Sequence, residues 1–280
     1  MKIGIIGLGL IGGSLGLDFK AQGCHHVLGV SRRAETCQRA IARNVVDDAS
    51  PDLALVGDAD VVFLCTPLGA IRSTVENLLP HLSDHTVLTD VGSVKAPVVD
   101  AIAPLWSNFV GGHPMAGTAE SGLDAALSEL FVDRAYVITP VEDTPPAAIE
   151  VVAELARSLR SCVYQCHPQD HDQAVAWISH LPVMVSATLI TACRDESHQT
   201  VLELAQTFAS SGFRDTSRVG GGNPELGVMM ARYNQAALVR SLHAYRERLD
   251  QLIHTVEQGD WNTLEAELRQ TQSDRPKFVE

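Results

Sequence analysis

The chain has 280 residues, of which 45% are hydrophobic and 20% are charged, and its formal net charge is −13. These values are typical of a folded globular protein that is long enough for two domains. The acidic balance argues against nucleic acid as a partner, because binding to phosphate backbones requires a basic surface. No run approaches the roughly 18 uninterrupted apolar residues of a membrane helix, so no membrane association is expected. Six scattered cysteines without a secretory signal predict a cytoplasmic protein with reduced thiols.

The first seventeen residues predict a binding site for a dinucleotide. Lys2–Ile6 is a short apolar run typical of a buried parallel strand, and a helical segment follows the sequence GLGLIG at residues 7–12. This G-x-G-x-x-G pattern permits a tight turn, close approach of a pyrophosphate to the backbone, and packing of helix on strand. The N-terminus of the helix offers free N–H groups and a positive dipole end to the phosphates. The cofactor-binding residues predicted here are Gly7, Gly9, Leu10, Ile11 and Gly12.

The second predicted strand, His26–Val30, indicates which dinucleotide is bound. An NAD site carries an acidic residue at the end of this strand, where it binds the ribose 2′-hydroxyl. Here the position holds Ser31, followed by Arg32 and Arg33. A hydroxyl and guanidinium groups would bind a 2′-phosphate, which a carboxylate would repel. The sequence therefore favours NADP over NAD, the alternative being that both arginines are solvated surface charges.

Two further strands are predicted at Asp60–Cys65 and Thr86–Val91, and both end at the sheet edge where ligands bind in open α/β folds. Cys65 ends the first of them and Thr66 and Pro67 follow it, and all three are predicted to contact the cofactor. Ser93 follows the second. It could be the N-cap of the next helix, a contact to the cofactor or substrate, or both.

His113 is the candidate catalytic base. The short apolar run Phe109–Gly111 predicts a strand, and the following segment GHPMAG at residues 112–117 predicts a rigid loop that carries the histidine. An imidazole has an ordinary pKa of about 6.5, which suits proton transfer near neutral pH.

Alternation of strands and helices stops after the predicted strand Cys162–Gln165. The fold class expected is therefore an α/β Rossmann domain with a doubly wound, mostly parallel sheet at residues 1–165, followed by an all-α domain at residues 166–280. A helical pattern from Pro224 to about Glu257 would be about 50 Å long, which predicts a homodimer interface. No metal is predicted, because the spacing of the cluster Cys162, Cys166, His167 and His171 does not match that of zinc sites.

Seven motifs occur in an order that resembles the prephenate/arogenate dehydrogenase family of tyrosine biosynthesis across nearly the whole chain. They are GLGLIG at 7–12, TP at 66–67, DVGSVK at 90–95, GGHPMAG at 111–117, HD at 171–172, SHLP at 179–182 and FRDTSR at 213–218. With the serine and arginines of the NADP type, the chain is most similar to the cyanobacterial arogenate dehydrogenases. The resemblance implies a Rossmann domain, a helical dimerisation domain, and oxidative decarboxylation of a cyclohexadienol with hydride transfer to NADP.

The resemblance also implies roles for individual residues. His113 would accept the proton of the ring hydroxyl, with Ser93 in contact with His113 and that hydroxyl, and Arg218 would bind a substrate carboxylate. His180 would face the cleft from the helical domain. The remaining substrate-binding residues expected are Arg214 and Thr118.

The substrate expected is arogenate, with prephenate as the alternative. Many prephenate-using members read SHLPH, and Val183 stands where the second histidine would be. Two other functions fit the residues less well. A β-hydroxyacid dehydrogenase would need a lysine in the helical part, and none occurs between residues 166 and 276. A non-catalytic NADP-binding sensor would not need the histidine and arginine of the site.

Overall fold

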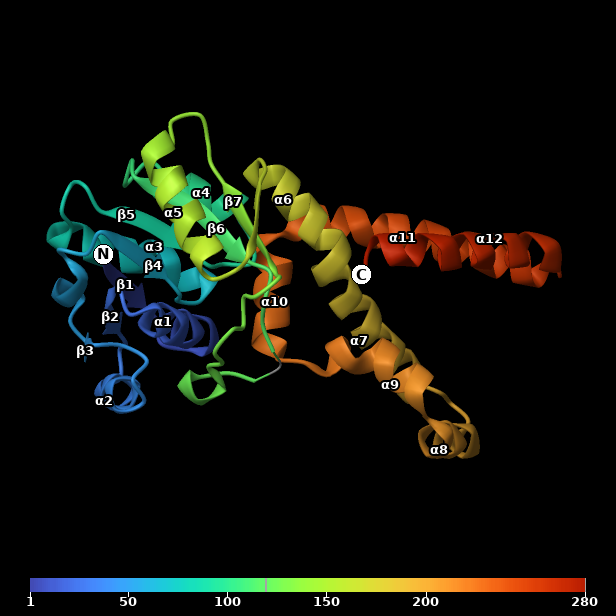
Figure 1. Cartoon of the computed structure of the whole chain (residues 1–280). Coiled ribbons are helices and arrows are strands. Elements are labelled where there is room, and N and C mark those ends of the chain that lie inside the picture. The colour runs from blue at the N-terminus through green and yellow to red at the C-terminus, as the bar shows by residue number, and fades with distance from the viewer. Residues whose placement is uncertain (119, 280) are drawn as a thin grey trace. The chain divides into compact units, whose positions relative to one another are not determined.

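The structure is a computed structural model that describes residues 1–118 and 120–279. These residues divide into two compact units, Met1–Asn234 and Gln235–Glu280, which are described separately. The first unit contains the whole sheet and the helices up to α10, and the second contains the hairpin of α11 and α12 (Figure 1).

The first unit is built on an eight-stranded sheet in the order β3-β2-β1-β4-β5-β6-β7-β8. All neighbouring pairs are parallel except β6 and β7, which are antiparallel. The strand order reverses between β1 and β4, which is where open α/β sheets bind their ligands. The strands are β1 (Lys2–Ile6), β2 (His26–Val30), β3 (Asp48–Ser50), β4 (Val61–Leu64), β5 (Val87–Asp90), β6 (Phe109–Pro114), β7 (Ala135–Thr139) and β8 (Cys162–Gln165).

Helices cover both faces of this sheet, because alternate side chains of its central strands are apolar on both sides. Ile3 and Ile5 of β1 join one buried cluster with residues of α1, α2 and α5. Ile6 of the same strand joins a second cluster with residues of α3 and α4. The doubly wound fold class predicted from the sequence is therefore confirmed. The helices of this layer are α1 (Leu10–Gln22), α2 (Ala34–Ala42), α3 (Leu68–Leu78), α4 (Ala96–Ile102) and α5 (Pro146–Ser158).

After β8 the described residues form helices and connecting loops and no further strand, as the sequence predicts. α6 (Pro168–Val175) continues through a π-helical turn at Ala176–His180 into α7 (Leu181–Arg194), and these form one long helix. The elements that follow are α8 (Gln199–Phe208), α9 (Ser211–Ser217), a 3-10 turn at Arg218–Gly221, and α10 (Pro224–Tyr233). The second unit consists of α11 (Gln235–Glu257), α12 (Trp261–Asp274) and a 3-10 turn at Arg275–Lys277.

Among the described residues, the helix Pro168–Arg194 is long and apolar enough to cross a membrane by length and composition alone, and 28% of its apolar window is buried. The sequence predicted no such segment because polar residues interrupt every apolar run. A core or interface helix meets the same criterion, and this one carries the buried polar side chains of His171 and Asp172.

The predicted continuous helix from Pro224 to Glu257 is wrong, because the structure interrupts it at Asn234. Asn234 has φ −120° and ψ 35°, which ends α10, and α11 starts at the next residue. The reason is a tertiary interaction. The buried amide of Asn234 donates to the carbonyl oxygen of Asp172 at 2.7 Å, and helical periodicity alone cannot reveal such a bond. α11 alone is about 34 Å long.

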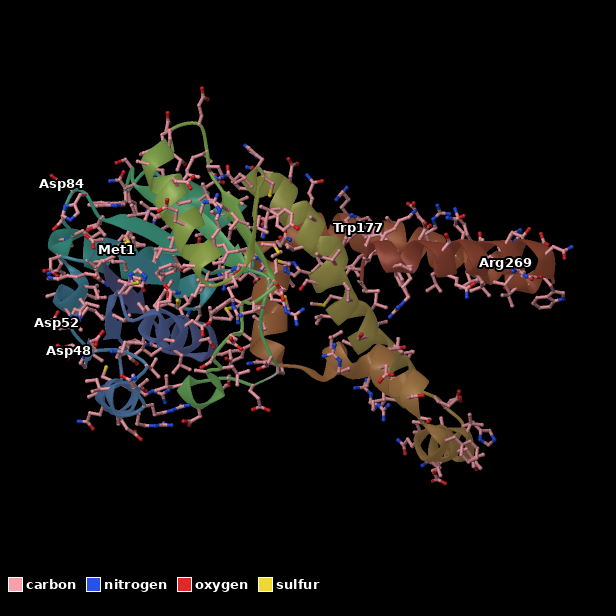
Figure 2. The ribbon with its side chains drawn as sticks, viewed as in Figure 1. Met1, Asp48, Asp52, Asp84, Trp177 and Arg269 are labelled. Carbon is pink, nitrogen blue, oxygen red and sulfur yellow. The ribbon has the colours of Figure 1, made fainter. Side chains whose placement is uncertain are left out.

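Some of the acidic side chains that make the net charge negative are exposed on the surface. Asp48, Asp52 and Asp84 are exposed on the sheet-containing unit (Figure 2). In the second unit Arg269 of α12 forms an exposed ion pair with Glu265, one helical turn earlier. Such exposed pairs contribute little to stability.

Candidate active site

The carboxyl ends of β1, β2 and β4 form a cradle that fits a dinucleotide. Gly7 follows β1 with φ +105°, and a Cβ there would meet the carbonyl oxygen of Cys65. A Cβ at Gly12 would collide with the carbonyl oxygen of Gly7, so this glycine is needed for the turn itself. A Cβ at Gly9 would meet nothing within 4 Å. Gly9 is the N-cap of α1, so open space faces the unpaired N–H groups of Leu10 and Ile11.

The residues predicted to select the cofactor lie beside this loop. The N–H of Gly7 donates to the carbonyl oxygen of Val30 at 2.9 Å, which places Ser31 next to the glycine-rich turn. Arg32 and Arg33 are exposed, and neither forms an ion pair with any part of the chain that the structure describes. Cys65, Thr66 and Pro67 follow β4, the neighbour of β1. The Thr66 hydroxyl is buried without a partner among the described residues.

His113 belongs to a strand, not to a loop as predicted. β6 extends through Pro114 because His113 pairs with Val137 of the antiparallel β7, and no local sequence pattern indicates that partner. His113 Nδ1 lies 2.8 Å from His171 Nε2, and the two rings meet edge to face. His171 Nδ1 lies 2.8 Å from Asp172 Oδ1. The structure thus joins His113 to two buried residues of α6.

Ser93 is not an N-cap. α4 begins at Ala96, and the carboxylate of Asp172 caps it from another helix by accepting the N–H of Lys95 at 2.7 Å and of Ala96 at 2.9 Å. Ser93 lies in the loop after β5, and the parallel register of β5 with β6 sets this loop beside His113. No hydrogen bond links Ser93 to His113 within the described ranges, where the ring partner of His113 is His171.

A buried ion pair fixes the backbone in front of His113. Lys95 and Asp90 have fully buried side chains and are paired with each other. The ammonium of Lys95 also donates to the carbonyl oxygen of Gly112 at 2.6 Å, and Asp90 accepts the N–H of Gly112 at 3.2 Å and of Gly92 at 2.8 Å. The pair therefore holds both the loop that carries Ser93 and the strand that carries His113.

His180 is buried at the end of the π-helical turn, a local structure often found at functional sites. Its Nδ1 lies 3.2 Å from the side-chain nitrogen of Asn234, which also donates to the carbonyl oxygen of Asp172. The Asn234 amide can only donate through this nitrogen, so His180 Nδ1 is the acceptor and the proton is on Nε2. That Nε2 is buried and has no partner within residues 1–118 and 120–279.

The other predicted substrate-binding residues lie further out. Arg218 is exposed at the start of the 3-10 turn that packs on α7, where a Cβ at Gly220 would meet Ser186. Ser186 is six residues after His180, or roughly 9 Å along the helix axis. Arg214 pairs with the adjacent Asp215 on the surface. Thr118 is exposed in the loop after β6, and its hydroxyl accepts the N–H of Glu120 at 3.2 Å.

The electrostatic environment keeps the histidines neutral. Burial lowers the pKa of His113 well below its usual value, and the nearby Lys95 adds to this effect. Burial also lowers the pKa of His180 to about 4. Both imidazoles are therefore neutral at pH 7, where one ring nitrogen of each accepts a hydrogen bond and the other donates one.

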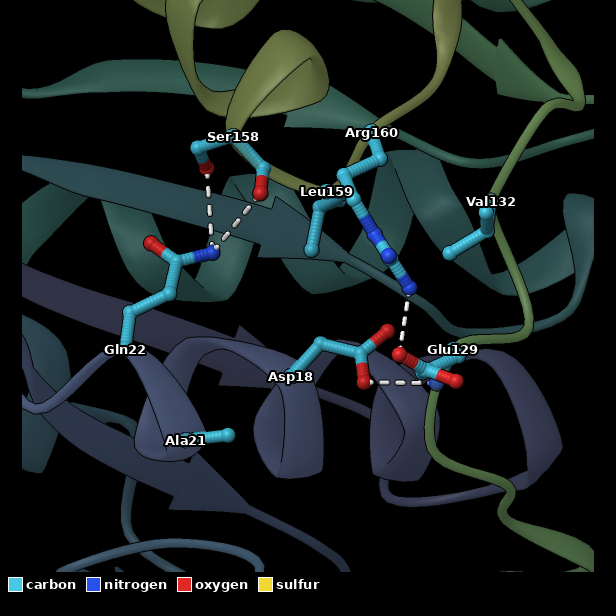
Figure 3. A pocket seen from close by; sticks show the side chains of 8 residues that line it. All are labelled: Asp18, Ala21, Gln22, Glu129, Val132, Ser158, Leu159 and Arg160. Carbon is cyan, nitrogen blue, oxygen red and sulfur yellow. Dashed lines mark hydrogen bonds and ion pairs between the residues drawn. The ribbon is translucent and has the colours of Figure 1, made fainter.

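A separate cavity of about 200 Å³ lies between the C-terminal half of α1, the end of α5 and residues 129–132 (Figure 3). Asp18 accepts the N–H of Glu129 there at 2.8 Å, and Arg160 pairs with Glu129. None of the site residues predicted from the sequence lines this cavity.

Sequence reasoning missed several residues of the hydrogen-bond network around His113. The HD and DVGSVK motifs mark four of them, Asp90, Lys95, His171 and Asp172, although the motifs alone do not show which atoms meet. Asn234 carried no signal, because it lies inside an apparently continuous helical pattern.

Comparisons with known proteins place both parts of the chain in one family. Residues 15–165 match the model of the prephenate dehydrogenase nucleotide-binding domain, and residues 167–270 match that of the prephenate dehydrogenase dimerization domain. Prephenate dehydrogenase of Bacillus subtilis is 32% identical over 93% of this chain and 71% of its own length. The crystal structure of Synechocystis arogenate dehydrogenase is 54% identical, covers 100% of both chains and has a TM-score of 0.91. The structure of Aquifex aeolicus prephenate dehydrogenase in complex with hydroxyphenyl propionate and NAD+ is 25% identical, with a TM-score of 0.93 over 99% of this chain and 98% of that one.

The buried ion pair generates a prediction for stability. Lys95→Met leaves the Asp90 carboxylate buried and uncompensated, so the free energy of unfolding should fall by about 3–5 kcal/mol. The double variant Asp90→Asn/Lys95→Met should recover part of that loss, as measured by urea unfolding. The control is Lys2→Met, which removes the exposed pair of Lys2 with Asp58 and should leave the unfolding midpoint unchanged. Equal midpoints for Lys95→Met and Lys2→Met would contradict this account of the pair.

Proposed function

Because the chain belongs to the prephenate dehydrogenase family, we propose that it oxidatively decarboxylates arogenate to tyrosine with NADP. The observation that carries the proposal is a histidine with a lowered pKa at the end of β6, beside a dinucleotide cradle. In this proposal residues 1–165 bind the cofactor, and residues 166–280 complete the substrate site and form the dimer. Prephenate is the alternative substrate.

NADP is favoured by the residues at the end of β2. Ser31 replaces the acidic residue that would bind a ribose 2′-hydroxyl, and Arg32 and Arg33 are exposed without ion pairs in the described part of the chain. Guanidinium groups that have no internal partner can bind a 2′-phosphate through charge-assisted hydrogen bonds. In a protein of net charge −13, such local cations are what attract the phosphate.

His113 supplies the proton chemistry. A nicotinamide held by the glycine-rich turn would supply the acceptor for the hydride of the hydroxyl-bearing ring carbon. His113, neutral because its pKa is lowered, accepts the hydroxyl proton at the same carbon. Loss of carbon dioxide then yields the aromatic ring, and the phenolate oxygen recovers a proton. The reaction therefore needs one base and an oriented substrate but no further acid.

Substrate binding is assigned to cations and donors of the helical segments. Arg218 is exposed, so its guanidinium can reach a carboxylate, and the buried Nε2–H of His180 needs an acceptor. Arg214 and Thr118 are placed in the same role, and Ser93 would contact the ring hydroxyl. Val183, in the first turn of α7, supports arogenate, since many prephenate-using members carry histidine there. The high identity to Synechocystis arogenate dehydrogenase supports the same choice.

The quaternary state proposed is a homodimer in the cytoplasm. α11 exposes apolar side chains at spacings of three and four, which form one face of the helix: Tyr245, Leu249, Leu252, Ile253 and Val256. The match to a dimerization domain supports a second copy as the cover of this face. All six cysteines are free thiols, which suits a reducing compartment.

The first prediction for this function concerns specificity. Steady-state kinetics with both substrates and both cofactors should give a kcat/KM at least tenfold higher with NADP than with NAD, or about 1.4 kcal/mol, and a higher value with arogenate than with prephenate. Ser31→Asp combined with Arg32→Gln should shift the preference toward NAD. Arg157→Gln, a change to an exposed arginine of α5, is the matched control. A wild-type protein that used NAD as well as NADP would refute the 2′-phosphate assignment.

The second prediction separates chemistry from binding. His113→Ala should lower kcat by at least about 10² with little effect on KM, since it removes the base. Arg218→Ala should raise KM by about 10- to 150-fold, because a charged hydrogen bond is worth roughly 1.5–3 kcal/mol. Arg194→Ala, at another exposed arginine, should change neither constant.

The wild-type pH profile adds to the same test. The lowered pKa of His113 means that the base stays unprotonated below pH 6.5, so kcat should stay constant through that value and fall only at lower pH. Full activity in a folded His113→Ala protein would rule out the mechanism.

The third prediction concerns assembly. Light scattering at micromolar concentration should give about twice the chain mass of 30.1 kDa, and Leu249→Glu with Leu252→Glu should shift the protein toward the monomer. The control Arg269→Glu changes an exposed residue of α12 outside the apolar face and should leave the mass unchanged. A wild-type monomer would exclude the proposed dimer.

A further inference from the structure

The hydrogen-bond chain that leads away from His113 ends on a carboxylate whose position is fixed. Asp172 Oδ1 accepts from His171 Nδ1 and from the N–H of Lys95, and Oδ2 accepts from the N–H of Ala96. The carbonyl oxygen of the same residue accepts from Asn234. His171 and Asp172 have relative exposures of 3% and 5%, so water does not compete for these contacts. The side chains of His113, His171 and Asp172 are therefore held in one arrangement.

This arrangement determines which nitrogen of each imidazole carries a proton. Asp172 Oδ1 can only accept, so His171 Nδ1 must donate to it. With Nδ1 donating to Asp172, the other ring nitrogen of His171, Nε2, presents its lone pair to His113. His113 Nδ1 lies 2.8 Å from that lone pair and must therefore carry the proton of its own ring. The free lone pair of His113 is left on Nε2.

We propose that His171 and Asp172 are positioning residues, which fix the tautomer of His113 and orient its Nε2 lone pair toward the substrate hydroxyl. The proposal rests on the proposed function, in which His113 is the base. It assigns a role to two residues that had none in the proposed function, and it requires no transfer of the proton beyond His113. The same logic operates wherever a buried carboxylate holds a catalytic imidazole in one tautomer.

The alternative is that His171 and Asp172 are purely structural, because Asp172 caps α4 and both residues join α6 to the sheet. A structural role needs only the Asp172 contacts to Lys95, Ala96 and Asn234. It does not need His171 Nε2 to lie within hydrogen-bond distance of the candidate base. Substitution at His171 therefore tests positioning and leaves the cap of α4 in place.

The experiment compares two variants of His171 in the full-length enzyme. His171→Leu removes the acceptor for His113 Nδ1–H, so kcat should fall at least about tenfold, because an imidazole in the wrong tautomer loses general-base catalysis worth about 10²–10⁴-fold. KM should change little. His171→Gln has an amide oxygen that can accept from His113 and an amide N–H that can donate to Asp172, so it should recover most of the lost kcat.

The matched control is His25→Leu, which alters another partly buried histidine that packs on Phe19, away from the site. It should leave kcat and KM at wild-type values. If His171→Leu does not fold, His171→Met makes the same test, because it also removes the acceptor for His113 Nδ1–H while Asp172 keeps its bonds to Lys95 and Ala96.

The outcomes separate this inference from the proposed function. If His113→Ala is inactive while His171→Leu, or His171→Met in its place, keeps the wild-type kcat, the positioning role is wrong and the base assignment stands. Equal losses of kcat in His171→Leu and His171→Gln would also overturn the role, because the amide would then supply nothing that leucine lacks. If His113→Ala keeps full activity, the failure lies in the proposed function. Loss in His171→Leu with recovery in His171→Gln supports the inference.

Discussion

The buried carboxylate of Asp172 connects three segments of the first unit around His113. Its two oxygens accept hydrogen bonds from the first N–H groups of α4, the helix after β5, and from the side chain of His171 in α6. Its backbone carbonyl oxygen accepts a hydrogen bond from the side-chain amide of Asn234, the residue that separates α10 from α11. A buried carboxylate must be fully hydrogen-bonded to be tolerated. These hydrogen bonds hold the start of α4, α6 and the end of α10 together at the end of the strand that carries His113.

The buried ion pair of Lys95 and Asp90 supports the same strand from the sheet side. Lys95 and Asp90 hold the backbone at Gly112, while the N–H of Lys95 contacts Asp172. Burial lowers the pKa of the Lys95 ammonium, and pairing with Asp90 opposes that effect. The DVGSVK segment thus contributes a backbone donor, an ammonium and a carboxylate to the support of one histidine. Support of this kind fixes the geometry of a catalytic group before the substrate arrives.

Much of this arrangement follows from the sequence, because local patterns determine it. Short local patterns predict the strand Lys2–Ile6, the GLGLIG turn after it, and the end of β2 before the serine and arginines. The structure has a strand, a turn and a strand end at these places. The parts that sequence reasoning got wrong depend on partners far along the chain. His113 is in a strand because β7 pairs with it, and Asp172 replaces Ser93 as the cap of α4 although it lies 76 residues from Ala96. The break at Asn234 likewise depends on Asp172 and His180.

The central claim is that His113 offers an unprotonated Nε2 at neutral pH. The most direct measurement is ¹⁵N NMR of the enzyme labelled at its histidines, with the signals of His113 assigned by comparison with His113→Ala. The account predicts that at pH 7 the proton of His113 resides on Nδ1 and that Nε2 has the chemical shift of an unprotonated ring nitrogen. A proton on Nε2, or a doubly protonated ring at that pH, would contradict it.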